Sequence, residues 1–201
     1  MRRLLIFLIV FWSGFFVMAV ELLSARLIAP HFGSSIYVWG AIITVFMLGL
    51  AAGYWCGGML SLTRPSLRKL AAILCLAAIA TIPAVLAADR VMTWLFALIQ
   101  DPRYGALAAA ALLFFAPTAV SGMVSPYAVR LLVDENRRSG QHAGRLYCAA
   151  TVGSAAGTIA TSFYWVLYWE VNHILWALIG VSLLIGAGGL AAKEAADAPE
   201  V

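Results

Sequence analysis

The sequence predicts an all-α membrane protein with six transmembrane helices. Of its 201 residues 64% are hydrophobic and only 11% are charged, and the mean hydropathy is +0.95. Soluble domains carry about 25% charged residues. The apolar residues form long runs of roughly 20, the length that a helix needs to cross the hydrocarbon core. In lipid, helices satisfy every backbone polar group internally, and the chain length fits one domain.

Six apolar runs mark the predicted spans. They lie at residues 4–29, 36–62, 70–88, 104–123, 146–168 and 174–191. The fourth can continue to residue 132, with a kink where Pro126 removes a backbone donor. Residues 1–192 are thus expected to form one transmembrane domain, and residues 193–201 a short cytoplasmic tail.

The start of the first span and the segment after the third span need separate interpretation. The apolar stretch after Arg2 and Arg3 is longer than the core of a signal peptide, so we expect an uncleaved first span. After the third span, apolar residues recur at helical spacing: Val91, Trp94, Leu95 and Leu98. This pattern predicts a short helix in the membrane interface.

The distribution of Lys and Arg predicts the orientation. A cytoplasmic amino terminus puts ten of these residues in cytoplasmic segments and three at the outer side. Cytoplasmic segments near spans are enriched in positive charge. The ten are Arg2, Arg3, Arg64, Arg68, Lys69, Arg130, Arg137, Arg138, Arg145 and Lys193, and the three are Arg26, Arg90 and Arg103. Both termini are therefore expected in the cytoplasm, and the bacterial cytoplasmic (inner) membrane is the expected location.

The two halves of the chain resemble each other. A shift of 104 residues gives eight identities over the 28 positions of residues 26–53, including Gly49 on Gly153 and Gly53 on Gly157. Three spans per unit is an odd number, so the two units would have opposite orientations. Inverted repeats of this kind are common in transporters. The sequence thus predicts two inverted three-helix repeats, half of a major-facilitator-like bundle.

Small residues at helical spacing predict close helix contacts. They are Gly49, Gly53 and Gly57 in the second span and Gly153 and Gly157 in the fifth. Without side chains at these positions, two helix backbones can approach closely. Packing within one bundle, a gliding surface and a dimer seam all remain open.

Glu21 is the most informative single residue. It lies within the first span, where a carboxylate costs roughly 2.5–3.5 kcal/mol on insertion scales. Arg26 is five residues further on, roughly 140° around the helix, so the two are not ideally stacked. Glu21 is either an interhelical hydrogen-bonding group or a site for a cation or a proton.

Other chemistry is not indicated. His31, Glu170 and His173 do not have a recognised metal-ligand spacing, and the three cysteines lie apart in apolar runs. No nucleophile elbow, P-loop or dinucleotide fingerprint is present. Nor does a basic stripe with interleaved aromatic residues suggest nucleic-acid binding. We expect no metal, no cofactor, no nucleic-acid partner and no independent enzymatic activity.

One stretch resembles a known membrane family. Residues 21–39 read Glu-Leu-Leu-Ser-Ala-Arg-Leu-Ile-Ala-Pro-His-Phe-Gly-Ser-Ser-Ile-Tyr-Val-Trp. The likeness continues at residues 49–58, at Ser125-Pro126-Tyr127 with Arg130, and at residues 144–157. The chain is similar to the transmembrane portion of spermidine-synthase-like membrane proteins, the fused major-facilitator/spermidine synthase family.

The resemblance implies a membrane portion like half of a major-facilitator transporter, commonly followed by an aminopropyltransferase-like domain. This chain stops at Val201 without such a domain, so polyamine synthesis by this polypeptide is not expected. Glu21, Arg26, Tyr37 and Arg130 follow from the resemblance as candidates for contacts with a substrate or a partner.

Two functions remain open. The first is a non-catalytic accessory or scaffold subunit in the bilayer, with a separately encoded soluble domain or a larger membrane complex as its partner. The alternative is a transporter of small cationic or amphipathic solutes such as polyamines, formed as a homodimer. Sparse intramembrane charge favours the first, and the repeat favours the second.

Overall fold

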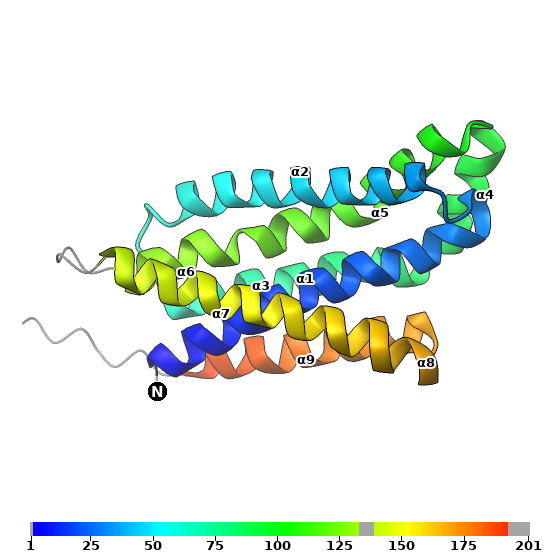
Figure 1. The fold of residues 1–201 in the computed structure, drawn as a ribbon. Coiled ribbons are helices and arrows are strands. Elements are labelled where there is room, and N and C mark those ends of the chain that lie inside the picture. The colour runs from blue at the N-terminus through cyan, green and yellow to red at the C-terminus, as the bar shows by residue number, and fades with distance from the viewer. Residues whose placement is uncertain (1, 133–138, 193–201) are drawn as a thin grey trace, which may run out of the picture.

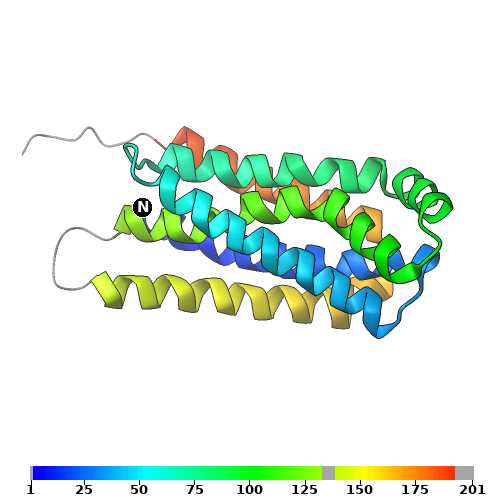
Figure 2. The ribbon, with the colours of Figure 1, turned by 90° about the horizontal axis from the view of Figure 1, so that it is seen from above.

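The structure is a computed structural model that describes residues 2–132 and 139–192. Within these residues every regular element is helical, and the axes of the long helices lie roughly along one common line (Figures 1 and 2). The elements are α1 (Arg2–Phe32), α2 (Ile36–Leu60), α3 (Leu67–Leu86), α4 (Ala88–Leu98), α5 (Pro102–Gly122), α6 (Val124–Leu132), α7 (Ser139–Ile159), η1 (Ala160–Trp165), α8 (Val166–Tyr168) and α9 (Val171–Ala191).

Five stretches of helix are long and apolar enough to cross a membrane: α1, α2, α3, α5 continued by α6, and α9. They correspond to the first, second, third, fourth and sixth predicted spans, with ends shifted by a few residues. The chain is therefore an all-helical, multi-pass membrane protein. Residues 146–168, the predicted fifth span, lie in α7, η1 and α8 and are not among these five.

The fourth span breaks one turn before its proline. Pro126 has no N–H to donate to the carbonyl of Gly122, four residues earlier. Accordingly α5 ends at Gly122 and α6 begins at Val124. Pro126 itself occupies the first turn of α6, where a missing donor is tolerated. The sequence-based prediction that the span continues to residue 132 agrees with the 31-residue stretch of Pro102–Leu132.

A π-helical turn interrupts the helical stretch of residues 139–168. The six residues of η1 form this turn between α7 and the short α8. Hydropathy periodicity carries no signal for it. Such turns insert wider hydrogen-bonded loops into α-helices and occur frequently at functional sites.

Helix α1 is at the centre of the bundle. It packs most extensively against α7 and also contacts α2, α5 and α9, while α2 packs mainly on α5 and α3 on α9. Its buried residues include Val20, Leu23 and Ile28, which belong to the larger hydrophobic core. Ile6 and Ile9 belong to a second core at the end that holds the amino terminus (Figure 1). A helix surrounded in this way presents apolar residues on most of its circumference.

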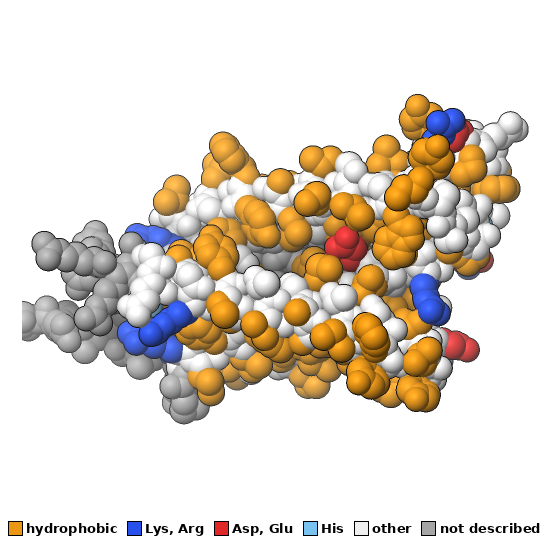
Figure 3. All heavy atoms as spheres, in the orientation of Figure 1, with side chains coloured by type: hydrophobic (Ala, Val, Ile, Leu, Met, Phe, Trp, Pro, Cys, Tyr) orange, Lys and Arg blue, Asp and Glu red, His pale blue; other side chains and the backbone are white. Residues whose placement is uncertain are grey.

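The surface of the bundle is apolar along its length. Large side chains are exposed on several helices, among them Met47, Trp55, Leu112 and Leu184, of which Trp55 and Leu184 are more than 70% exposed. Figure 3 shows apolar side chains along the body, with Lys and Arg at both ends and one acidic group midway. An exposed apolar surface of this extent is typical of contact with lipid.

The short helix after the third span is present as predicted. Helix α4 buries Ala88, Met92 and Leu95 against the bundle and exposes Trp94 and Leu98. The periodicity therefore placed the helix correctly, and the structure adds that Met92 and Leu95 pack inward while Trp94 faces outward. Large apolar groups on the outer face suit an interfacial position.

Candidate functional site: a pocket at one end of α1

A hollow lies where α1, α2 and η1 meet. It has a volume of about 270 Å³. Helix α1 contributes four residues at helical spacing to its floor, the start of α2 with the preceding loop forms one wall, and η1 with α8 forms the other. The lining residues are Leu22, Ala25, Arg26, Ala29, Ser34, Val38, Trp39, Thr161, Ser162 and Val166.

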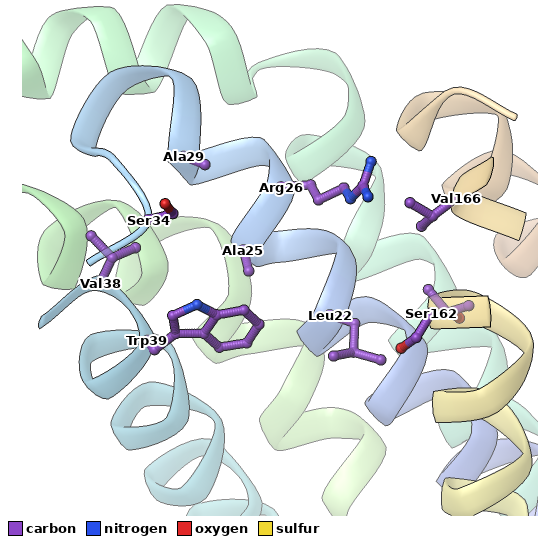
Figure 4. Close-up of a pocket in the computed structure, with 10 residues that line it drawn as sticks. Leu22, Ala25, Arg26, Ala29, Ser34, Val38, Trp39, Ser162 and Val166 are labelled. Atoms are coloured by element: carbon purple, nitrogen blue, oxygen red, sulfur yellow. The ribbon is translucent and has the colours of Figure 1, made fainter. Parts of the chain in front are cut away.

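The polar groups of the pocket come from all three of its sides. Figure 4 shows Arg26 extending from α1 towards Val166, with the Ser162 hydroxyl pointing across the gap towards Leu22. Arg26 is exposed and has no ion pair among the described residues. Thr161 is completely buried, and its Oγ1 has no hydrogen-bond partner among the residues that the structure describes. The pocket thus combines one free cation with hydroxyl groups and apolar walls.

Glu21 lies one residue before the pocket floor, deeper in the bundle. It is half-buried, and its side chain has no hydrogen bond or ion pair within the described part of the chain. Its backbone carbonyl accepts a 2.6 Å hydrogen bond from Ser24 Oγ. At 1.5 Å per residue, Glu21 is about 16 Å from the end of α1. No ion pair joins Glu21 to Arg26, as their poor stacking along the helix would suggest.

Tyr37 interacts with a different arginine. The Arg103 guanidinium lies over the Tyr37 ring, 5.4 Å from its centroid. Asp101 caps α5 by accepting the Arg103 backbone N–H at 2.9 Å, and it also accepts Arg103 Nε–H at 3.2 Å. These two hydrogen bonds, the backbone one first, lower the pKa of the Asp101 carboxyl. Tyr37 and Arg103 together join the start of α2 to the start of α5.

Arg130 is not part of the pocket. It is exposed near the end of α6, at the end of the bundle that also holds the amino terminus (Figure 1). The pocket is at the other end of α1. Of the four predicted contact residues, the structure therefore brings Glu21 and Arg26 to one region, places Tyr37 at the same end, and leaves Arg130 apart.

The predicted packing glycines lie at two helix seams. In α2, Gly49 faces the Phe115 carbonyl and Thr118, Gly53 faces the Ala119 carbonyl and the Gly122 Cα, and Gly57 faces Met123. In α7, Gly153 and Gly157 face the α1 backbone at Phe11 and Phe15. A side chain at any of these glycines would meet neighbouring atoms closely. They therefore allow the close approach of α2 to α5 and of α7 to α1.

The two histidines at the pocket end of the bundle each lie near a different carboxylate. His31 Nε2 is 3.5 Å from Asp89 and 3.4 Å from Thr93 Oγ1, whereas His173 Nδ1 is 3.6 Å from Glu170. Among the described residues no group of three His, Cys, Asp or Glu side chains is close enough to hold a metal ion. The cysteines at positions 56, 75 and 148 are free thiols.

Comparisons with protein-family models, with curated proteins and with solved structures each find no match. The family resemblance of residues 21–39 consequently rests on their sequence alone.

Sequence analysis missed the residues that complete the pocket. Thr161 and Ser162 are unremarkable small residues in an apolar run, and no periodicity separates them from packing residues. Trp39 entered only as the last residue of the stretch 21–39 that resembles the membrane family. What distinguishes Thr161 is its unpaired hydroxyl within a π-helical turn, which is a property of tertiary structure.

Proposed function

We propose that this chain is a non-catalytic membrane module that docks a partner helix along the uncovered face of α1. The supporting observation is Glu21, a half-buried carboxyl within a membrane span that has no side-chain partner in the described part of the chain. An ionisable group in lipid is costly and is almost always paired or solvated. A partner helix that carries a hydrogen-bond donor or a cation opposite Glu21 would remove this cost.

The face of α1 that surrounds Glu21 suits such a partner. Met18, Leu22 and Arg26 follow each other at four-residue spacing, and none of them is fully buried. Gly14, one turn earlier, is covered by Ala150 and Ser154 of α7, so the open face begins at Met18. Residues spaced in this way share one face of a helix. The partner would thus meet an apolar stripe with one carboxyl beside it, and Arg26 at its end.

We also propose that residues 146–168 form a sixth span and that the bundle consists of two inverted three-helix repeats. The glycine seams support this arrangement. Gly49 faces the Phe115 carbonyl and Gly153 the Phe11 carbonyl, while Gly53 faces Ala119 and Gly157 faces Phe15. Each residue of one seam differs from its counterpart in the other by 104 positions, the offset of the sequence repeat.

The family resemblance agrees with a scaffold role. In the spermidine-synthase-like membrane proteins that residues 21–39 resemble, the membrane portion accompanies a soluble domain. We propose that this chain is a related membrane portion whose soluble or membrane partner is separately encoded. Independent catalysis is not part of the proposal.

We propose that both termini face the cytoplasm of a bacterial inner membrane. In a variant with Cys56, Cys75 and Cys148 replaced by alanine, Ser34→Cys should react with a membrane-impermeant maleimide in intact cells. Leu62→Cys, which is also exposed but lies at the opposite end of the bundle, should react only after permeabilisation. Both positions are exposed, so the reverse labelling pattern would contradict the orientation.

The docking proposal is tested by photo-cross-linking in native membranes. A photo-reactive amino acid at Met18, on the face of Glu21, should give one protein adduct of defined size. Glu21→Leu should remove this adduct, because the apolar side chain cannot hydrogen-bond to the partner. Glu21→Gln, which keeps the shape and one acceptor, should retain part of it.

The control position is Leu184 on α9, which is 74% exposed. The same photo-reactive residue there should react with lipid alone. Adducts at Met18 that consist only of lipid, or a protein adduct that is insensitive to Glu21→Leu, would contradict the docking proposal.

The second candidate function is transport of small cationic or amphipathic solutes by a homodimer. The matched glycine seams favour it, because inverted repeats with gliding helices are typical of transporters. In that case Glu21 is a cation or proton site. Glu21→Gln should then abolish solute-dependent or proton-dependent uptake into vesicles while the protein stays folded, and the Met18 adduct should be a second copy of this chain.

A further inference from the structure

The hydroxyl of Thr161 is anomalous among the buried hydroxyls of the bundle. Thr81 donates to the Ala77 carbonyl at 2.9 Å, and Ser182 donates to the Leu178 carbonyl at 2.8 Å. Both use the carbonyl four residues earlier, as hydroxyls in membrane helices commonly do. Thr161 Oγ1 is equally buried but has no partner. An unpaired buried hydroxyl costs about 1–3 kcal/mol.

The π-helical turn accounts for the unpaired hydroxyl. Thr161 is the second residue of η1, and the wider hydrogen-bonding pattern of a π-turn displaces carbonyls from their α-helical positions. Thr161 lines the pocket together with Ser162, the next residue of the same turn. A ligand in the pocket can therefore accept a hydrogen bond that the protein itself does not satisfy.

The charge of the pocket selects an anion. Arg26 lines it and has no ion pair among the described residues. Figure 4 shows its guanidinium group on the same side of the gap as Val166, opposite Trp39. Guanidinium groups bind phosphate and carboxylate oxygens through parallel hydrogen bonds. A tetrahedral phosphate can accept these bonds and still reach hydroxyl donors in other directions.

The walls and the depth of the pocket suit an amphiphile. Leu22, Val38 and Val166 provide apolar lining, and the volume of about 270 Å³ holds a phosphate with its attached glycerol. Arg26 is six residues before the end of α1, about 9 Å along the helix. This is close to the interface, where lipid phosphates lie, and Trp39 is an aromatic residue of the kind enriched there.

We propose that the pocket between α1, α2 and η1 binds a phosphodiester anion, that of a membrane phospholipid, through Arg26 and the hydroxyl of Thr161. The acyl chains would leave along the apolar walls into the bilayer. This site shares Leu22 and Arg26 with the face of α1 proposed for docking, but lipid binding needs neither Glu21 nor a protein partner.

The test measures lipid retention by the purified full chain with native mass spectrometry and with thermal unfolding in detergent. Phosphatidylglycerol should bind as one retained lipid and raise the melting temperature. Arg26→Gln should weaken binding about tenfold or more, the usual effect of losing a charge-assisted hydrogen bond. Thr161→Val should weaken it several-fold.

Two controls separate binding from folding. Arg90→Gln removes an exposed arginine of α4, at the same end of the bundle but outside the pocket, and should leave lipid binding unchanged. Thr161→Val removes an unpaired buried hydroxyl, so the melting temperature without lipid should stay equal or rise, while the lipid-dependent increase should shrink. If this hydroxyl instead stabilised the fold, Thr161→Val would lower the melting temperature in the absence of lipid.

Competition experiments with two other compounds identify the source of the phosphate. Diacylglycerol, which has the acyl chains without the phosphate, should not compete with phosphatidylglycerol. Inorganic phosphate that displaces the lipid, with the same dependence on Arg26 and Thr161, would assign the anion site to a soluble phosphate compound. Equal lipid binding by the wild type, Arg26→Gln and Thr161→Val, or equal binding of diacylglycerol, would overturn the proposal.

Discussion

Gly53→Ala should destabilise the bundle by about 1–3 kcal/mol, the usual cost of an extra methyl group in a packed core. A Cβ at this position would meet the Ala119 carbonyl and would lie 2.8 Å from the Gly122 Cα. Both are backbone atoms of α5, so no flexible side chain can move aside. The two helices must separate, and the close contacts along their seam weaken together.

Gly157→Ala should have an effect of similar size. Its Cβ would meet the Phe15 carbonyl and would lie 2.9 Å from the Phe15 Cα, so α7 would separate from α1. Similar losses at the two seams are the energetic consequence of the proposed inverted repeat. Unfolding in sodium dodecyl sulfate, followed by tryptophan fluorescence, measures both variants.

Gly58→Ala is the matched control. Gly58 is in the same helix as Gly53, and a Cβ there would have no atom within 4 Å. Alanine favours helix over glycine by about 0.5–1 kcal/mol, so this variant should be neutral or slightly more stable. If Gly53→Ala unfolds at the same detergent fraction as Gly58→Ala, the close approach of α2 to α5 is not what stabilises the bundle.

Trp12→Ala should lower stability by about 3 kcal/mol, in the range measured for deleted aromatic side chains in cores. The Trp12 ring stacks on Phe15 at 5.0 Å between centroids and 8° between planes. Phe15 in turn contacts Trp165 at 5.4 Å. The Trp12 Nε1–H also donates a 2.8 Å hydrogen bond to Ser182 Oγ. Trp12 thereby joins α1 to α9, and Phe15 extends the contact to η1.

Trp12→Phe separates the two contributions. The ring remains, so most of the stacking should be kept, whereas the hydrogen bond to Ser182 is lost, with an expected cost of about 1 kcal/mol. A double-mutant cycle with Ser182→Ala isolates the hydrogen bond. Ser182 Oγ–H also donates to the Leu178 carbonyl. The coupling free energy from the cycle, and not the stability change of either single variant, is therefore the decisive value. A coupling near zero would mean that Trp12 acts through its ring alone.

Local composition was sufficient to predict the spans. Hydrophobic runs of helical length located α1, α2, α3, the Pro102–Leu132 stretch and α9 within a few residues, since the bilayer forces such runs into helices. The chemistry of proline located the bend near Pro126 in the same way. For α4 the period predicted the helix, but which of its apolar residues meet the bundle depends on the neighbouring helices, so the period did not identify Met92 as the buried residue.

The candidate residues show a different limit. Glu21 could be singled out because a carboxylate within a span is expensive wherever the other helices lie. Its lack of a pair with Arg26 depends on side-chain directions around α1, and the separation of Arg130 from the others depends on which ends of the helices meet. Neither can be obtained from spacing along one helix.

The sequence by itself determined that the chain is helical, apolar and multi-pass, and which residues are unusual for that setting. These properties are local, because each span must satisfy its own backbone in lipid. Only the tertiary structure decided that Gly53 meets Ala119 while its neighbour Gly58 meets nothing, and that Thr161 is buried without a partner beside Arg26. These are contacts between segments more than 50 residues apart, and they depend on how the helices rotate and pack against each other.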